Sequence, residues 1–144
     1  MRPNRPLRTR PSAALLVGIS VLTSTVARAE PAFDGEFKGR GEGRLSLQVS
    51  TLDDPPAVAG MYFVSVETAV LNRCTGQVTG IARKTAQNTL RLRKKPDENG
   101  EACEITLRYR PDGKSVQVEE NACAYWHGTE CAFDGRLTKV LTGR

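Results

Sequence analysis

Hydrophobic and polar side chains alternate along much of the chain, and this period of two predicts β-strands rather than helices. From Glu36 to Val49 the apolar residues share one parity and the charged residues share the other, as expected of a half-buried strand. The apolar parity of this segment also contains Gly39, Gly41 and Gly43. Glycines weaken the interior of a strand, so we expect strong curvature here, or space for a bulky side chain from across the core.

Strand-like patterns continue toward the C-terminus, separated by turn-forming residues. The run 58–71 is apolar on both parities, which favours a central strand or a strand that is covered on both sides. The last run, 131–141, is expected to point Phe133, Leu137 and Leu141 inward. Shorter or weaker strand patterns occupy residues 77–84, 90–93, 103–109 and 116–118.

These segments amount to seven or eight strands, with turns roughly every 8 to 12 residues and no helical pattern beyond the N-terminal region. Such a pattern predicts an all-β fold, an antiparallel meander that is either closed into a barrel or packed as a sandwich. Two matching tetrapeptides, Ala32-Phe33-Asp34-Gly35 and Ala132-Phe133-Asp134-Gly135, favour the barrel, because the first and last strands pair when a meander closes. Chance similarity between two strand starts is the alternative explanation. The expected fold is a small antiparallel meander barrel.

The N-terminal region has the pattern of a secretory signal peptide. Arginines at positions 2, 5, 8 and 10 precede an apolar run over 13–26, which leads into Ala27-Arg28-Ala29. The run is shorter than the roughly 20 residues of a bilayer-spanning helix, which favours cleavage over membrane anchoring. We therefore expect residues 1–29 to be a cleaved signal peptide. Residues 30–144 would form one domain in the periplasm or outside the cell, with no transmembrane segment.

The basic charge of the chain comes from this leader. The whole sequence contains 21 Lys and Arg against 16 Asp and Glu, a formal charge of +5. Residues 1–29 hold five of the arginines and no acidic residue, so the mature domain has equal numbers of basic and acidic side chains. The composition therefore gives no support for nucleic acid as the partner.

Four cysteines, Cys74, Cys103, Cys123 and Cys131, all lie in the mature domain. An even number in a small exported domain predicts two disulfides. Their wide spacing and the single histidine of the chain argue against a metal site. A meander brings all four cysteines near one end of the sheet. Because Cys123 and Cys131 flank one loop, the pairing 123–131 with 74–103 is favoured over the two other connectivities.

The segment between Cys123 and Cys131 is the first candidate for function. It contains the only tryptophan, Trp126, and the only histidine, His127, together with Tyr125. Tyrosine and tryptophan are common interface anchors, and a constrained loop loses less entropy on binding. In the alternative interpretation, Trp126 covers the open end of the barrel as a hydrophobic plug and His127 is a surface or capping residue.

A basic segment is the second candidate. Arg91, Arg93 and Lys95 share a parity and would lie together on the solvent face of a hairpin. Such a patch suits lipopolysaccharide phosphates or another anionic polymer of the envelope. The alternative is charge that discourages edge-to-edge pairing of strands. No nucleophile, metal or phosphate-loop motif is present, so the chain is not expected to be an enzyme and no cofactor is expected.

The end of the chain, Cys123-x-Tyr125-x-His127-Gly128-x-x-Cys131-x-Phe133-x-Gly135, resembles the closing hairpin of small exported proteins of Gram-negative bacteria that are mostly uncharacterised. A small disulfide-bonded periplasmic barrel is also similar in architecture to bacterial lysozyme inhibitors, whose loops enter an enzyme cleft. The signature loops of those inhibitors are absent, so this second likeness concerns the fold alone.

These observations predict a binding or inhibitor-like module of the periplasm that engages a protein or envelope component through its aromatic loop. Two other hypotheses remain. One is binding of an anionic envelope lipid or polymer through the basic segment. The other is a barrel that carries a small ligand in its interior, near the three strand glycines.

Overall fold

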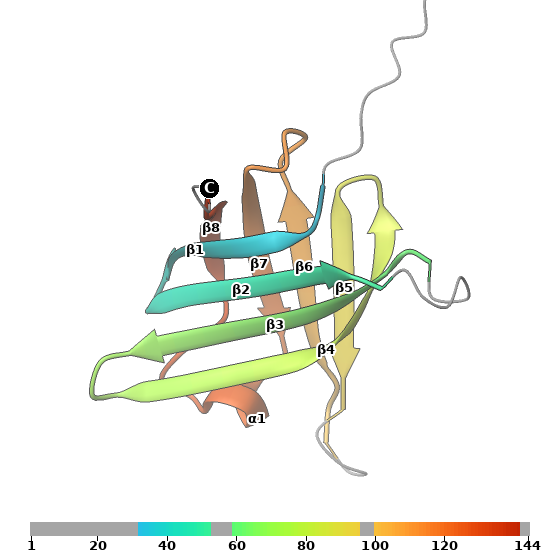
Figure 1. Ribbon diagram of the computed structural model, residues 1–144. Coiled ribbons are helices and arrows are strands. Elements are labelled where there is room, and N and C mark those ends of the chain that lie inside the picture. The colour runs from blue at the N-terminus through green and yellow to red at the C-terminus, as the bar shows by residue number, and fades with distance from the viewer. Residues whose placement is uncertain (1–31, 53–58, 96–99, 142–144) are drawn as a thin grey trace, which may run out of the picture.

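The structure, a computed structural model, describes residues 32–52, 59–95 and 100–141 and shows a closed antiparallel barrel of eight strands (Figure 1). Each strand pairs with the next, and β8 pairs with β1. The expected signal peptide, residues 1–29, lies outside the described residues. The elements are β1 (Gly35–Gly41), β2 (Arg44–Thr51), β3 (Met61–Val70), β4 (Cys74–Ala86), β5 (Thr89–Lys94), β6 (Cys103–Tyr109), β7 (Ser115–Asn121), α1 (Ala124–His127) and β8 (Gly135–Lys139).

The meander barrel is thus confirmed, with one departure in its first segment. Residues 36–49 form the hairpin β1–β2 instead of one strand, and the chain reverses at Glu42 and Gly43. The last pair of the hairpin is Arg40 with Arg44, and the three residues between them keep the alternation of parities intact, so the pattern continued through the turn unbroken. The inward face was predicted correctly, since its apolar residues are buried: Phe37, Leu45, Leu47 and Val49.

Two strand glycines close the barrel. A Cβ atom on Gly39 would overlap the carbonyl oxygen of Arg136, and one on Gly41 would overlap that of Asp134. Both contacts come from β8 or the residue before it, so the glycines let the backbones of the first and last strands approach. They accommodate this approach of β8 rather than a bulky side chain.

The two matching tetrapeptides have matching roles. Phe33 and Phe133 are both buried, and because β1 and β8 are antiparallel they enter the core from opposite ends of the barrel. The carboxylate of Asp34 accepts hydrogen bonds from the backbone N–H and hydroxyl of Thr51. The carboxylate of Asp134 accepts one from the backbone N–H of Glu120 at 3.0 Å.

Large side chains fill the barrel. One continuous buried cluster extends from Phe33, whose ring meets Tyr62 and Tyr109 edge-to-face at 5.2 and 4.8 Å, to Phe133. Inward side chains from all eight strands join this cluster, for example Val64 and Val66 of β3. The interior is therefore a packed core along the described length of the strands.

Three expectations from the sequence need correction. Within the run 58–71, β3 is a central strand that pairs with both β2 and β4, but it is not covered on both faces, because Phe63 is 40% exposed on its outer face and Leu71 is 81% exposed in the turn after it. Strand β8 ends at Lys139, and Leu141 is exposed rather than inward. Residues 124–127 form a helical turn where the sequence predicted no helix.

The two disulfides are present, but the predicted pairing is wrong. Cys103 bonds to Cys123 and Cys74 bonds to Cys131. Cys103 opens β6 and Cys123 follows β7, the strand hydrogen-bonded to β6, so their Cα atoms lie 4.4 Å apart. The favoured pair 74–103 would have to bridge from β4 across β5 to β6, about 10 Å, which exceeds disulfide reach.

We predict that Tyr109→Phe stabilises the protein. The Tyr109 hydroxyl is buried without a hydrogen-bond partner among the described residues, so its removal should add about 1 kcal/mol at pH 7. Burial, with a further contribution from the charge of Asp34, raises the pKa of Tyr109 above its usual range. The folded protein therefore keeps this proton while the unfolded chain loses it above about pH 10, and stability falls as the pH rises further.

Urea denaturation at pH 7 and pH 11 tests both expectations. The Tyr109→Phe variant should lose less stability between the two pH values than the wild type. Tyr125→Phe, at an exposed position, serves as the control and should follow the wild type. If Tyr109→Phe is less stable than the wild type at pH 7, the Tyr109 hydroxyl contributes a favourable contact and the prediction is wrong.

Candidate functional site

The aromatic segment is held at both ends. We call residues 123–131 the α1 loop. Its first residue, Cys123, is bonded to Cys103 at the start of β6, and its last, Cys131, is bonded to Cys74 at the start of β4. The loop therefore crosses one end of the barrel between two anchored points, and α1 lies beside the first part of β4 (Figure 1). Two bridges to two strands replace the single ring that the sequence predicted.

His127 is part of the scaffold of this loop. It is 8% exposed, and its Nε2 lies 2.9 Å from Oε1 of Glu120. The other oxygen of Glu120 accepts a hydrogen bond of 2.7 Å from the backbone N–H of Phe133, whose ring meets the imidazole edge-to-face. Glu120 thus joins the loop to the start of the last strand. His127, predicted as a binding residue, faces inward.

Trp126 and Tyr125 have different environments. Trp126 is partly buried against the core, and Nζ of Lys94 lies 5.0 Å from the centre of its ring. Lys94 is itself fixed, because it donates a hydrogen bond of 2.7 Å to the carbonyl oxygen of Thr79. Tyr125 is 65% exposed and meets the indole edge-to-face. One part of the indole therefore packs as the plug interpretation expected, and the rest borders a groove.

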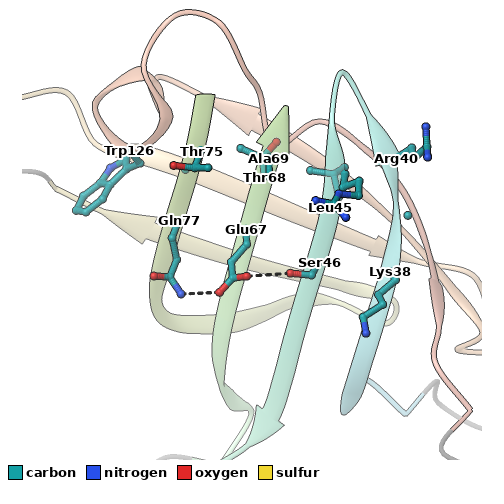
Figure 2. A pocket seen from close by; sticks show the side chains of 13 residues that line it. Lys38, Arg40, Leu45, Ser46, Glu67, Thr68, Ala69, Thr75, Gln77 and Trp126 are labelled. Atoms are coloured by element: carbon teal, nitrogen blue, oxygen red, sulfur yellow. Dashed lines mark hydrogen bonds between the residues drawn. The ribbon is translucent and has the colours of Figure 1, made fainter. Parts of the chain in front are cut away.

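The groove is a hollow of about 820 Å³ on the outer wall of β1–β4, with Trp126 at one end (Figure 2). Its outward-facing residues form two rows that follow the strand register. The first row runs from Trp126 across two small residues to two arginines: Thr75, Ala69, Arg44 and Arg40. The second row lies beside it on the same four strands: Gln77, Glu67, Ser46 and Lys38.

The second row is an ordered polar network. Glu67 accepts a hydrogen bond from the Ser46 hydroxyl at 3.2 Å and one from the side-chain amide of Gln77 at 2.8 Å (Figure 2). The same amide lies 3.3 Å from the hydroxyl of Ser65. We call Ser46, Glu67 and Gln77 the polar ladder. Its members restrain one another, so the wall presents oriented donors and acceptors instead of freely rotating side chains.

The basic segment is separate from the groove. Arg91 and Arg93 lie on the outer face of β5, as predicted, and Lys95 follows the strand. Arg91 is paired with Glu104 at 3.5 Å, which offsets part of the local charge. None of these residues borders the groove, so the structure does not combine the two predicted sites into one.

The sequence did not identify the groove residues of β1–β4. It placed Lys38, Arg40, Arg44 and Ser46 on a polar face of the segment 36–49 and gave no role to Glu67, Ala69, Thr75 and Gln77. The available signal was the run of small and hydrogen-bonding side chains on that face. Using it requires the register between four strands, which parity alone does not supply.

The chain matches no protein-family model, no curated protein and no solved structure, so its function is argued from geometry. In the part of the chain that the structure describes, no three His, Cys, Asp or Glu side chains are grouped to hold a metal ion. Within the same residues, no helix has the length and apolar character needed to cross a membrane.

We predict that Gly76→Ala displaces the α1 loop. A Cβ atom at this inward position of β4 would overlap Cβ of His127 and lie 2.9 Å from the carbonyl oxygen of Trp126. Such overpacking costs about 1–3 kcal/mol or moves the loop. Since Trp126 is the only tryptophan, a red shift of its fluorescence should report the movement.

Gly80→Ala is the matched control on the same strand. A Cβ atom there would touch the flexible side chain of Leu92 at 3.2 Å and lie in ordinary contact with that of Lys94 at 3.9 Å, so we expect no displacement of the loop. Emission spectra that are identical for the two variants would show that β4 does not set the position of α1.

Proposed function

We propose that this protein is an exported, non-catalytic binding module that holds an envelope glycan in the groove between Trp126 and the arginines of β1 and β2. The observation that carries the proposal is the combination in one hollow of an aromatic ring, a floor of small residues and an ordered polar ladder.

A sugar ring needs these three features. It has an apolar face of C–H groups, which packs on an aromatic ring, and hydroxyl groups around its rim that donate and accept hydrogen bonds. Trp126 supplies the ring at one end of the groove. Glu67 supplies acceptor oxygens and Gln77 supplies both a donor and an acceptor. Ala69 and Thr75 leave the space between them in which a ring lies flat against the strands.

The site is also built before a ligand arrives. The loop that carries Trp126 is anchored by disulfides at Cys123 and Cys131, and Glu67 and Gln77 are already hydrogen-bonded to each other. Little side-chain or loop entropy is therefore lost on binding. This preorganisation favours the interpretation that the groove is a recognition surface and not merely a solvated outer face.

The compartment agrees with an envelope ligand. Two disulfides indicate an oxidising environment, and the sequence of residues 1–29 has the pattern of a cleaved export signal. We therefore place the mature domain in the periplasm or outside the cell. Cell-wall and surface glycans are abundant partners there.

Binding is preferred to cleavage because of the acids present. Most glycoside hydrolases use two carboxylic acids about 5–10 Å apart, one on each side of the scissile bond. Glu67 is the single acidic residue among the described residues that line the groove, and two hydrogen bonds engage it. The arrangement suits hydrogen bonding to hydroxyl groups.

The other two hypotheses have less support. Arg91, Arg93 and Lys95 of the basic segment do not line the groove, and Arg91 is paired with Glu104. The interior that a small ligand would need is occupied by the buried cluster of core side chains.

We predict that Gln77→Ala weakens glycan binding at least tenfold while leaving the fold intact, because Gln77 is exposed and its amide completes the polar ladder. Binding is measured by the fluorescence of Trp126 during titration with oligosaccharides four sugars long. Gln48→Ala is the matched control, since this exposed glutamine lies on the outer face of β2 outside the groove.

Equal loss of affinity in both glutamine variants would place the binding site elsewhere. If no oligosaccharide changes the fluorescence of the wild type or binds by calorimetry, the proposal itself is wrong. A photo-cross-linker at Tyr125 then offers a route to a protein partner, with Lys95 as the position that reports on the basic segment.

A further inference from the structure

Three arginines stand side by side on the outer wall of the barrel. Arg40 of β1 is directly opposite Arg44 of β2 on one side and Arg136 of β8 on the other. All three are exposed and have the outward parity of their strands. We call them the arginine row. Arg44 and Arg40 end the first row of the groove, and Arg136 continues it beyond the end opposite Trp126.

The row is not neutralised by the protein. Like charges directly opposite on neighbouring strands destabilise a sheet. Some cations elsewhere on the surface have acidic partners: Arg108 pairs with Glu119 at 3.1 Å and Lys38 with Glu36 at 2.8 Å. Among the described residues, no acid forms an ion pair with any member of the arginine row, although Glu42 lies in the adjoining turn.

We propose that the arginine row binds the anionic group of an acidic saccharide whose remaining rings extend along the groove to Trp126. This inference rests on the proposed function and names its ligand class. A carboxylate, sulfate or phosphate accepts two hydrogen bonds from one guanidinium in a planar pair, and neighbouring guanidinium groups can share one anion. An anion also removes the repulsion between the three positive charges.

The dimensions agree with an oligosaccharide. From Arg40 on β1 to Thr75 on β4, both of which line the groove, the row crosses three strand-to-strand spacings, or about 14 Å, and Trp126 lies beyond Thr75. A single sugar cannot reach both ends. A chain of several rings can place an acidic group on the arginines while another ring packs on the indole.

The charges also set the direction of the ligand. Glu67 lies near the middle of the groove and would repel an acidic group placed beside it. The anionic group is therefore expected at the β1, β2 and β8 end, and hydroxyl groups are expected beside Glu67 and Gln77. Repulsion by the Glu67 carboxylate and attraction to the arginine row together favour a ligand with one acidic terminus over a polymer that is charged on every ring.

The test compares Arg40→Gln with Arg110→Gln. Arg40 is the central member of the row, and Arg110 is an exposed arginine after β6 that lies outside the groove. Arg40→Gln should bind acidic saccharides at least tenfold more weakly. It should also unfold about 1–4 °C higher in the absence of ligand, because a like-charge repulsion is removed. Arg110→Gln should change neither property.

The probes are three pairs of matched length, each with an acidic and a neutral member. They are mannotetraose and cellotetraose, each with the aldonic acid formed by oxidation of its reducing end, which has one terminal carboxylate, and a peptide-free strand of alternating N-acetylglucosamine and N-acetylmuramic acid with chitotetraose. At least one acidic member should bind the wild type tenfold more tightly than its neutral partner, and less tightly as salt concentration rises.

The outcomes separate this inference from the proposed function. Neutral and acidic members that bind equally, with no effect of Arg40→Gln, would overturn the anion site and keep the groove as a glycan site. No binding by any of the six would overturn the proposed function. A lower unfolding temperature for Arg40→Gln would show that the arginine supports the fold, and would also overturn the inference.

Discussion

Pairing between β1 and β8 is the interaction on which the rest of the structure depends. It closes the barrel, and closure requires that residues 39 and 41 have no side chain, because the backbone at Asp134 and Arg136 occupies that space. The same pairing sets Arg40 beside Arg136. The registers of β1 with β2, β2 with β3 and β3 with β4 then decide which side chains share a row on the outer wall, from the arginines to Thr75. The seam that completes the core therefore also assembles the surface proposed to bind a ligand.

The α1 loop depends on a second set of constraints, which act at the end of the barrel where β4 and β6 begin. Each disulfide ties the loop to a different strand, and the Glu120 carboxylate links His127 to the backbone of Phe133. Nδ1 of His127 is buried without a partner among the described residues, so the position of the loop depends on the disulfides and on the two contacts of Glu120. Trp126 consequently has a fixed position at the end of the groove, although the helix that carries it is only four residues long.

Much of this fold could be predicted from the sequence, because parity is a local property. The apolar parity of residues 36–49 identified the buried face correctly even where the turn at Glu42 was missed. The matching tetrapeptides anticipated closure. Properties that depend on register were not accessible: the partner of Cys103 is set by the hydrogen-bonded neighbour of β6, and the groove by the alignment of four strands. Tyr125 and Trp126 were found because rare aromatic residues are visible in a sequence, whereas Glu67 and Gln77 look like ordinary surface residues.

The outer wall is a physically reasonable place for recognition in a barrel of this size. An eight-stranded barrel has an interior just wide enough for its own side chains, and here Phe33, Tyr109 and Phe133 help to fill it. Any function must then use the surface, where polar groups are solvated and free to match a ligand. The cost appears in the arginine row, whose like charges lower the stability of the free protein. In the proposed complex an anion offsets this repulsion at Arg40, so relief of the repulsion contributes to the binding free energy.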